Sequence, residues 1–365
     1  MKGGIIMARH SNADRKTSPL HMLAADARHA LIADWLTGAL GLAVRSLEPA
    51  SSDASFRRYF RAAVPGTTYI VMDAPADKED VRPYLKVSAL LADTGVHVPR
   101  VYARDEARGL LLLEDLGATS YLARLQAGAD PEPLYADALG ALVKIQVAGA
   151  CATLAPYNHA ELLRELSLMP QWFLARHLGV AVSAAEQALL AATFEFLIAE
   201  ALAQPTVFVH RDYHARNLMV VPQANPGIID FQDALAGPVG YDLVSLLKDC
   251  YIDWPRARVE GWVQDYRARL GRAGGPVGAD DMQFLRWFDL IGVQRHLKVL
   301  GIFCRLWYRD GKAGYLADLP RTLAYVSECC RLYAPLASFG EFLDTRVRRQ
   351  LALANERALA RGTDA

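Results

Sequence analysis

Three polar residues in one part of the sequence have the types and the spacing that phosphoryl transfer requires. Asp212 and Asn217 lie five positions apart in the run HRDYHARN, and Asp230 follows thirteen positions later in the run IDF. A carboxylate such as that of Asp212 can orient a hydroxyl group and accept its proton. The oxygens of Asn217 and Asp230 are hard donors of the kind that Mg²⁺ prefers. The three residues therefore predict a catalytic base beside a magnesium site.

Two other interpretations of these residues are weaker. A single Asp or Asn in a hairpin loop is more often a turn former than a ligand, but apolar runs before and after the polar groups favour a functional set. His210 and His214 flank Asp212 and could belong to a metallohydrolase. That class needs more ligands, and no further His/Asp cluster with ligand spacing follows in the sequence.

The polar run lies in a hairpin within a mostly helical region. The apolar run 207–209 leads into it, and the runs 218–221 and 227–231 predict the two strands of the hairpin. Long stretches of helical periodicity surround this hairpin. The predicted helices cover 134–150, 159–179 and 183–203, and helices return over 241–361 with a Gly-rich break at 271–278.

The first part of the chain has a different pattern. A helix over 24–40 precedes short β-rich runs that are separated by turn residues such as Pro65-Gly66 and Arg108-Gly109. The predicted strands cover 42–47, 56–64, 68–72, 100–103 and 110–113, with one helix over 81–92 after the third. This order predicts a small antiparallel α+β lobe of roughly ninety residues.

The length of the chain agrees with two lobes. With 365 residues, 52% of them hydrophobic, the chain is too long for one core, since single cores stop growing at roughly 250–300 residues. We predict an α+β fold with a small antiparallel-sheet N-lobe and a larger, mainly helical C-lobe. The predicted boundaries are a disordered N-terminus over 1–23, a nucleotide-binding lobe over 24–116, and a catalytic and substrate-binding lobe over 117–365.

Composition excludes several classes of protein. Forty Lys and Arg balance forty Asp and Glu, so no broad positive field would hold a nucleic acid or an anionic membrane. Five scattered cysteines without a CxxC pair argue against a disulfide framework and favour a reducing compartment.

No apolar run is long enough for export or membrane spanning, so we expect a cytoplasmic protein. Met7 and Met22 leave the start position open, and the oligomeric state is also left open.

The runs HRDYHARNLMV and GIIDFQDALAGPVGYDLVSLLKD resemble the aminoglycoside phosphotransferase and choline kinase family, which has a protein-kinase-like fold. With SSDASFRRYFR, IVMDAP, LLLEDLG and QRHLKVLGIFCRL, the chain looks most like the anomeric kinases of N-acetylmuramic acid and N-acetylglucosamine in cell-wall recycling. The resemblance implies ATP and Mg²⁺ as cofactors, Asp212 as the base, and Asn217 and Asp230 as metal ligands. It also implies that backbone groups from Glu114 to Leu116 contact adenine, that His210 is structural, and that Asp242 braces the same loop.

The sequence departs from the kinase pattern in two places. No G-x-G-x-x-G occurs, and the run SSDAS at 51–55 offers N–H groups and hydroxyls instead, so we assign Ser52 and Ser55 to the phosphates. A plain turn is the alternative. The third strand also lacks the lysine that kinases place on the phosphates. On the second strand Arg58 is our choice to replace it, because its planar fork suits phosphate oxygens.

The acceptor side carries an excess of positive charge. From Tyr241 to the end, nineteen Lys and Arg face fifteen Asp and Glu, a difference of +4, which suits a neutral or anionic acceptor better than a polycationic aminoglycoside. Four of the cations fall on one helical face. We assign Arg295 to substrate binding. For the other three, Lys298, Arg305 and Arg309, a solvent-exposed basic face of the helix is at least as good an explanation as substrate binding. Trp172 could be an apolar platform for a sugar ring, although an aromatic at helical spacing is more often core.

We therefore predict a sugar 1-kinase that uses ATP and Mg²⁺ to phosphorylate the anomeric hydroxyl of N-acetylmuramic acid, N-acetylglucosamine or both. Two alternatives stay open. One is a kinase of another small alcohol, such as an aminoglycoside, choline or homoserine. The other is a nucleotide-binding pseudokinase, which the missing strand lysine suggests. The sequence does not decide between the two sugars, the anomer used, or the residue that replaces the lysine.

Overall fold

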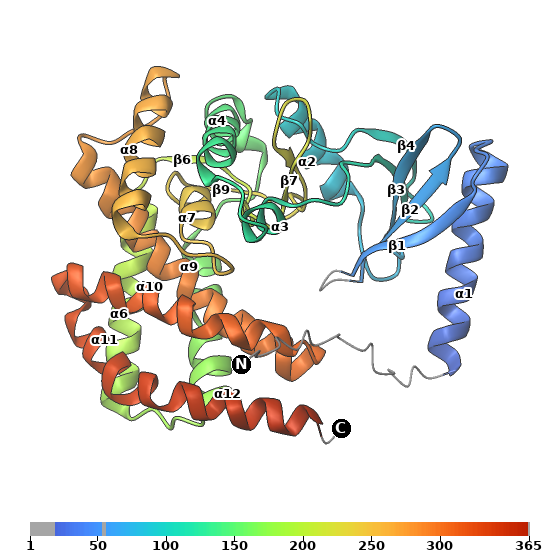
Figure 1. The fold of residues 1–365 in the computed structure, drawn as a ribbon. Coiled ribbons are helices and arrows are strands. Elements are labelled where there is room, and N and C mark those ends of the chain that lie inside the picture. The colour runs from blue at the N-terminus through green and yellow to red at the C-terminus, as the bar shows by residue number, and fades with distance from the viewer. Residues whose placement is uncertain (1–18, 53–55, 364–365) are drawn as a thin grey trace, which may run out of the picture. The chain divides into compact units, whose positions relative to one another are not determined.

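The computed structural model describes residues 19–52 and 56–363 of the chain. By its internal contacts the chain divides into two compact units (Figure 1). The first unit comprises Met1–Glu79 and Tyr102–Leu113, and the second comprises Asp80–Val101 and Glu114–Ala365. This division shows which elements pack together. The predicted lobe boundaries stay a prediction, and the N-terminal residues 1–18, for which we predict disorder, lie outside the described part.

The first unit is built on a five-stranded antiparallel sheet in the order β1-β2-β3-β5-β4. Its strands are β1 (Ser46–Ser52), β2 (Arg58–Val64), β3 (Thr67–Asp73), β4 (Val101–Asp105) and β5 (Leu110–Glu114). The β2–β3 hairpin turns at Pro65-Gly66, where Gly66 has φ +86°, a left-handed conformation that glycine adopts without steric cost. The predicted order of elements along the chain, three strands, one helix and two strands, is confirmed.

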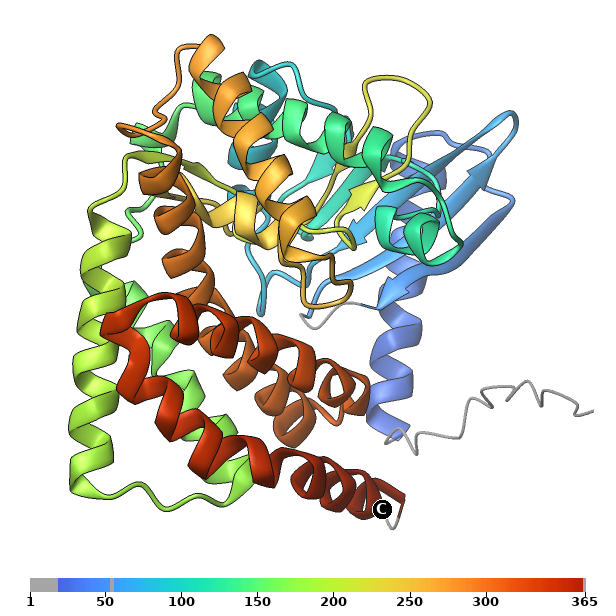
Figure 2. The same cartoon turned by 60° about the vertical axis from the view of Figure 1, so that its left-hand side comes forward.

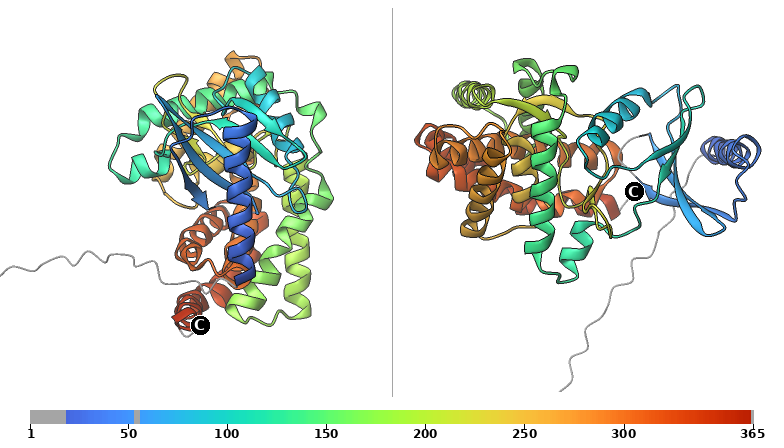
Figure 3. Two further views of the ribbon diagram at one scale, coloured as in Figure 1. Left: turned by 90° about the vertical axis from the view of Figure 1, so that its right-hand side faces the viewer. Right: turned by 90° about the horizontal axis from the view of Figure 1, so that it is seen from above.

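One face of this sheet is covered by the N-terminal helix α1 (Pro19–Asp34) and its π-helical extension η1 (Trp35–Ala39). Figure 3, left, shows α1 running across the strands. Alternate side chains of β2 point to this face, so that Phe60 and Ala62 join Trp35 and Leu36 in one buried cluster. This packing explains the apolar periodicity that predicted the helix.

The first strand begins later than predicted. Residues 42–44 use their N–H groups locally, because Leu42 donates to the carbonyl of Leu36 at 2.9 Å and Val44 to that of Leu42 at 3.0 Å. Pairing with β2 starts only at Ser46, and β1 continues through a register shift between Pro49 and Ser51. A proline cannot donate to the ladder, and such irregularities are where strands accommodate it.

The second unit is mainly helical. Its helices are α2 (Arg82–Asp93), α3 (Tyr121–Gln126), α4 (Pro131–Ala148), α5 (His159–Leu166), η3 (Met169–Leu178), α6 (Ala184–Leu202), α7 (Tyr241–Leu247), α8 (Arg256–Arg272), α9 (Asp281–Asp310), α10 (Leu319–Leu332), α11 (Ala337–Phe342) and α12 (Arg348–Thr363), with short turns η2 (Cys151–Thr153), η4 (Ala313–Asp318), η5 (Ala334–Leu336) and η6 (Leu343–Val347). The single helix predicted over 159–179 is α5 followed by the π-helical η3, whose second residue is Pro170. Proline has no N–H to continue an α-helical ladder.

The long helix α9 is the centre of this unit. Figure 2 shows α6 and the C-terminal helices around it, and α9 packs against η3, α6, α7 and α10. Close approach is possible at two of its glycines: a Cβ on Gly292 would lie 2.9 Å from Val244, and one on Gly301 would lie 2.4 Å from the backbone of Leu168. Since α9 is surrounded by other helices, most of its residues from 287 to 306 are buried.

Two small sheets lie among these helices. Strand β6 (Thr206–Val209) pairs antiparallel with β9 (Leu235–Pro238), and β7 (Leu218–Met219) pairs with β8 (Gly227–Ile228). The predicted hairpin is confirmed, although its strands are shorter than predicted, and β9 is an additional strand. These two sheets enclose the polar run 210–217. Among the described residues, no helix has the length and apolar content to cross a membrane, and all five cysteines are free thiols.

Candidate active site

The 210–217 loop connects β6 to β7 and brings the three predicted catalytic and metal residues together. The side-chain amide of Asn217 donates to the backbone carbonyl of Asp212 at 3.1 Å and to a carboxylate oxygen of Asp230 at 3.3 Å. All three side chains are half-buried. One amide thus connects the loop that carries Asp212 with the segment after β8 that carries Asp230.

His210 and Asp242 hold this loop from behind. The buried carboxylate of Asp242, in α7, accepts hydrogen bonds from the backbone N–H groups of His210 at 2.6 Å and Arg211 at 3.0 Å. The His210 ring donates from Nε2 to the carbonyl of Ile229 at 3.2 Å and accepts from the N–H of Asp212 at its Nδ1. Burial lowers the pKa of His210 to about 4, so the ring stays neutral with one donor and one acceptor. The structural roles expected for both residues are confirmed.

The backbone of the site has two left-handed positions outside glycine. Arg211 has φ +78° and Asp230 has φ +64°, conformations in which Cβ crowds the backbone. Such positions persist only where surrounding contacts enforce them, and they concentrate at functional sites. Here the enforcing contacts are the Asp242 carboxylate on the loop and the Asn217 amide on Asp230.

The Arg211 side chain points into a buried polar network. Its guanidinium pairs with the carboxylate of Glu165 in α5, and that carboxylate also pairs with Lys298 of α9 at 2.7 Å and accepts from the Tyr157 hydroxyl. Burial alone would raise the pKa of Glu165, but the charges of Lys298 and Arg211 lower it to about 2. Two cations therefore share one ionised carboxylate behind the loop.

The electrostatic surroundings keep Asp212 ionised. Burial alone would raise its pKa, but the nearby His214, Lys298 and Arg295 lower it below the ordinary value of an aspartic acid. A carboxylate that is ionised at neutral pH can accept a proton from an alcohol held beside it. The chemistry of a general base is therefore available at this position.

The donor set suits Mg²⁺ that is held together with phosphates. Since Asn217 donates through its nitrogen, its side-chain oxygen is left as an acceptor, and Asp230 contributes a carboxylate. Gln232 donates to the second oxygen of Asp230 at 2.9 Å, and its own buried oxygen has no hydrogen-bond partner in the part of the chain that the structure describes. The described part of the chain has no group of three His, Cys, Asp or Glu that could bind a metal alone. Mg²⁺ bound by one or two protein oxygens plus substrate phosphates needs no such group.

The predicted adenine segment begins at the end of β5. The Glu114 carboxylate hydrogen bonds to the His97 ring at 3.0 Å and to the N–H of Arg100 at 3.2 Å. Leu116 is buried, and a Cβ on Gly227 would lie 2.8 Å from its side chain. The segment is thereby attached to the β7–β8 hairpin of the same unit. Its contact with adenine stays a prediction.

The predicted phosphate residues lie in the first unit. The Arg58 guanidinium contacts the buried carboxylate of Asp73 with its Nε at 3.0 Å, and Arg28 of α1 contacts the other oxygen of that carboxylate at 3.0 Å. Arg58 is thus bound to an acid within its own sheet and is about one-third exposed. Ser52 ends β1, and Ser55 lies outside the described residues. The phosphate roles of these three residues stay predictions.

Of the two predicted acceptor residues, Arg295 lies close to the loop. Its side chain is buried in α9, with one terminal nitrogen 3.7 Å from the Cys250 sulfur and no hydrogen-bond partner for Nε among the described residues. Its charge acts on Asp212. Trp172 is half-buried in η3, the helix that begins just after Leu168. Both substrate roles stay predictions.

Two features of the site were missed by reading the sequence. Glu165 carried no motif, because its partner Arg211 is 46 residues away in the chain. The second is Lys298, for which the sequence makes a position on a solvent-exposed basic face at least as good an explanation as a role in the site. That explanation is wrong, because the Lys298 side chain is buried against Glu165 and Tyr241. An ionisable residue inside the otherwise apolar spacing of α9 was the available signal.

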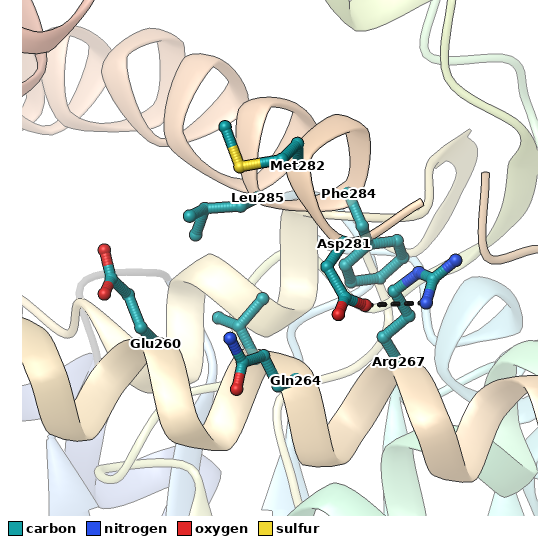
Figure 4. Close-up of a pocket in the computed structure, with 8 residues that line it drawn as sticks. Glu260, Gln264, Arg267, Asp281, Met282, Phe284 and Leu285 are labelled. Atoms are coloured by element: carbon teal, nitrogen blue, oxygen red, sulfur yellow. Dashed lines mark hydrogen bonds and ion pairs between the residues drawn. The ribbon is translucent and has the colours of Figure 1, made fainter. Parts of the chain in front are cut away.

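A small pocket elsewhere in the second unit does not belong to this site. It lies between α8 and α9, and its lining includes Met282 and an ion pair of 2.6 Å between Arg267 and Asp281 (Figure 4). None of its lining residues belongs to the 210–217 loop or to the segment 229–232.

Solved structures with the same fold include a choline kinase and an aminoglycoside phosphotransferase. A choline kinase, LicA from Streptococcus pneumoniae, aligns with a TM-score of 0.59 at 15% identity and covers 83% of this chain and 99% of its own. The ADP-bound aminoglycoside phosphotransferase APH(2'')-Ib aligns with a TM-score of 0.56 at 14% identity, covering 82% and 98%. These structural alignments show the fold, which is protein-kinase-like, and at such low identities they show the fold alone.

Sequence relatives are closer. N-acetylmuramate/N-acetylglucosamine kinase of Pseudomonas putida is 49% identical over 298 residues, which are 82% of this chain and 87% of the relative. The protein of the same name in Neisseria meningitidis serogroup B is 45% identical over 79% and 86%. The family model described as the phosphotransferase enzyme family matches residues 46–288, which include the β2–β3 and β7–β8 hairpins, the 210–217 loop and Asp242. The chain therefore belongs to the phosphotransferase enzyme family.

Proposed function

We propose that this protein transfers the terminal phosphoryl group of ATP to the anomeric hydroxyl at C1 of N-acetylmuramic acid, N-acetylglucosamine or both, in the recycling of peptidoglycan. The observation that carries the proposal is the Asn217 amide, which joins the Asp212 loop to the Asp230 carboxylate in a chain that is 49% identical to a kinase named for these sugars. The family relation supports a kinase, and the relatives' names support the sugar.

In this reaction Asp212 orients the acceptor hydroxyl and takes its proton. The hydroxyl oxygen forms a bond to the terminal phosphorus while the bond from that phosphorus to the oxygen of ADP breaks. Asn217 and Asp230 would hold Mg²⁺, which neutralises charge on the phosphates when bound. Positioning and charge neutralisation supply most of the rate in such reactions, since the protein forms no covalent bond.

The other proposed roles concern binding. Ser52, Ser55 and Arg58 would contact the phosphates of ATP, and the backbone from Glu114 to Leu116 would contact adenine. For Arg58 this requires that its guanidinium bind the phosphates while it stays bonded to the carboxylate of Asp73.

Arg295 would act on the acceptor, because its unpaired Nε and its charge lie near Asp212. Trp172 would supply an apolar surface to the sugar ring. We also propose a cytoplasmic location, where ATP is available.

The decisive experiment is a panel of acceptors with purified protein, ATP and Mg²⁺, in which ADP release is measured. The panel contains N-acetylmuramic acid, N-acetylglucosamine, their 1-deoxy analogues, choline, homoserine and an aminoglycoside. We expect turnover with the two reducing sugars and none with the 1-deoxy analogues. Equal rates with and without the anomeric hydroxyl would show that C1 is not the acceptor.

A second candidate function is nucleotide binding without transfer. The observation that favours it is the Arg58–Asp73 pair on the strands where a kinase has its phosphate-binding lysine. Against it, Asp212, Asn217 and Asp230 are all present and in contact. Phosphorus NMR of the reaction mixture separates the two candidates, because only a kinase produces a sugar phosphate signal.

A further inference from the structure

Arg216 lies inside the 210–217 loop, four residues after Asp212 and one before Asn217, and its side chain is exposed. The central carbon of its guanidinium is 4.1 Å from the ring centroid of Tyr251 and 5.5 Å from that of Tyr315. Tyr251 follows α7, and Tyr315 lies in η4 beyond the end of α9. Two segments that are distant in the chain therefore hold one exposed cation of the loop that carries the proposed base.

The two tyrosines are themselves fixed. The N–H of Tyr251 donates to the Asp249 carboxylate at 3.0 Å, and its ring meets the edge of the His214 ring at 5.5 Å. Phe303 of α9 contacts both tyrosine rings, at 6.0 Å from Tyr251 and 5.1 Å from Tyr315. The positions of these rings are set by packing before any ligand arrives, which limits the entropy lost when Arg216 binds one.

The charge of Arg216 is not neutralised by a carboxylate. Within the described part of the chain its guanidinium forms no ion pair. Asp249 is buried and accepts N–H groups from Ala215 and Tyr251, both at 3.0 Å. Asp318, the other acid on which Arg216 acts, is already bridged to Arg321 at 3.0 Å. Arg216 therefore contacts two tyrosines and, among the described residues, no acid, so an anion brought to this place would meet an uncompensated positive charge.

Two further cations, Arg295 and Lys298, act on Asp212. Arg295 is buried with no hydrogen-bond partner for Nε among the described residues, whereas Lys298 shares Glu165 with Arg211. An acceptor that carries a carboxylate would be attracted to a cation that no acid compensates. Of the two sugars in the proposed function, only N-acetylmuramic acid has a carboxylate. Arginine binds carboxylates through two parallel N–H donors, which gives direction as well as strength.

We propose that Arg216 recognises the carboxylate of an acidic acceptor and sets the preference for N-acetylmuramic acid over N-acetylglucosamine. Tyr251 and Tyr315 hold the guanidinium where that carboxylate arrives when the acceptor hydroxyl is at Asp212. The inference rests on the proposed function, because it assigns a binding contact to the proposed acceptor.

The test compares wild type with R216Q and R216K by initial rates for both sugars. In R216Q we expect kcat/KM for N-acetylmuramic acid to fall about 10- to 100-fold, mainly through a higher KM, because a charge-assisted pair is lost. For N-acetylglucosamine we expect a change of less than about threefold, since no charged contact is lost. R216K keeps the charge without the planar fork and should lie between the two.

Arg176 provides a matched control. It is an exposed arginine whose guanidinium carbon lies 5.2 Å from the ring of Tyr308, outside the 210–217 loop. R176Q should therefore leave the ratio of the two sugars unchanged. A ratio that is also unchanged in R216Q, whether both rates fall equally or neither falls, would overturn the inference and point to a phosphate contact or a structural role.

Binding without ATP separates this inference from the proposed function. If wild type phosphorylates neither sugar, the proposed function is wrong, and calorimetric titration with the two sugars still tests Arg216. Tighter binding of the acidic sugar to wild type, lost in R216Q, would support the inference. Equal binding of both sugars by wild type would overturn it.

Discussion

The carboxylate of Asp242 lies 2.6 Å from the backbone nitrogen of His210, at the start of the loop that carries Asp212. Its second oxygen accepts the N–H of Arg211 at 3.0 Å. Burial raises the pKa of Asp242 to about 7, and the two N–H donors oppose that rise. This one side chain fixes the backbone of the two residues that precede the proposed base Asp212, and it enforces the left-handed conformation of Arg211.

The first prediction concerns D242N. An asparagine has one acceptor oxygen, so one of the two N–H groups loses its partner and faces an amide nitrogen. A buried unsatisfied donor costs about 1–3 kcal/mol, and we expect the free energy of unfolding to fall by that amount. Displacement of the loop should lower kcat about 10- to 100-fold with little change in the KM for ATP. Chemical denaturation and initial rates measure both, and an unchanged kcat would contradict the positioning role.

The second prediction concerns D212N, which removes the base but keeps the size of the side chain. Since the amide cannot accept a proton from the acceptor hydroxyl, we expect kcat to fall by about 10²- to 10⁴-fold, with a thermal midpoint close to that of wild type. D265N, at a partly exposed acid of α8 that pairs with Arg269, is the matched control and should be fully active. Retained activity in D212N would reject Asp212 as the base.

The site could be predicted from the sequence where its geometry is local. The D-x-x-x-x-N spacing predicts Asp212 and Asn217 together, because one short loop can fold back on itself. In this loop the side-chain amide of Asn217 donates to the backbone carbonyl of Asp212. Asp230 was also predictable, since a hairpin returns the chain to the same place. The strand order of the first unit followed in the same way from alternating residues and turns.

Contacts between distant segments could not be predicted. Glu165 has no pattern that assigns it to Arg211, and Asp73 has none that assigns it to Arg28 of α1. These pairs form only after helices and strands have packed. A local cause explains β1, whose predicted start at Leu42 is wrong because the N–H of Leu42 donates to the helical residue Leu36 and that of Val44 to Leu42.

The third prediction concerns the metal. In D230A the only carboxylate of the proposed Mg²⁺ ligand set is lost, and the Asn217 amide loses one of its two partners. We expect ADP release to fall to background at millimolar Mg²⁺, because an amide oxygen alone holds this cation poorly. Rates measured across a Mg²⁺ titration check this. A variant that keeps the wild-type dependence on Mg²⁺ would show that Asp230 is not a ligand.

The fourth prediction concerns acid. Burial lowers the pKa of four histidines, His177, His210, His214 and His296, to about 4 for His210 and about 3 for His296. An unfolded chain protonates histidine near pH 6.5, so below that pH it binds protons that the folded chain does not. The free energy of unfolding must then fall as pH drops from about 6.5 towards 4.

Asp242 acts with the opposite sign in this range, because its raised pKa lets the folded chain bind a proton that the unfolded chain binds only near pH 4. Two protons on His210 and His296 of the unfolded chain minus one on Asp242 of the folded chain leave a difference that grows to about one proton near pH 5, a slope there of about 1.4 kcal/mol per pH unit. Urea midpoints at pH 7, 6 and 5 measure the slope. A midpoint that does not move between pH 6.5 and 5 would contradict neutral buried histidines.

The last prediction tests the packing that brings α9 behind the loop. In G301A the new Cβ would lie 2.4 Å from the backbone of Leu168, which cannot yield as a flexible side chain does, so we expect a loss of about 1–3 kcal/mol or more. The same exchange in G261A meets nothing within 4 Å in α8 and should stabilise the protein by about 0.5–1 kcal/mol, because glycine is the poorer helix former. Since α9 also carries Arg295 and Lys298, G301A should lower kcat as well, whereas G261A should not. A denaturation midpoint below wild type for G301A and above wild type for G261A would establish that α9 lies against the segment before η3. Equal midpoints for the two variants would show that it does not.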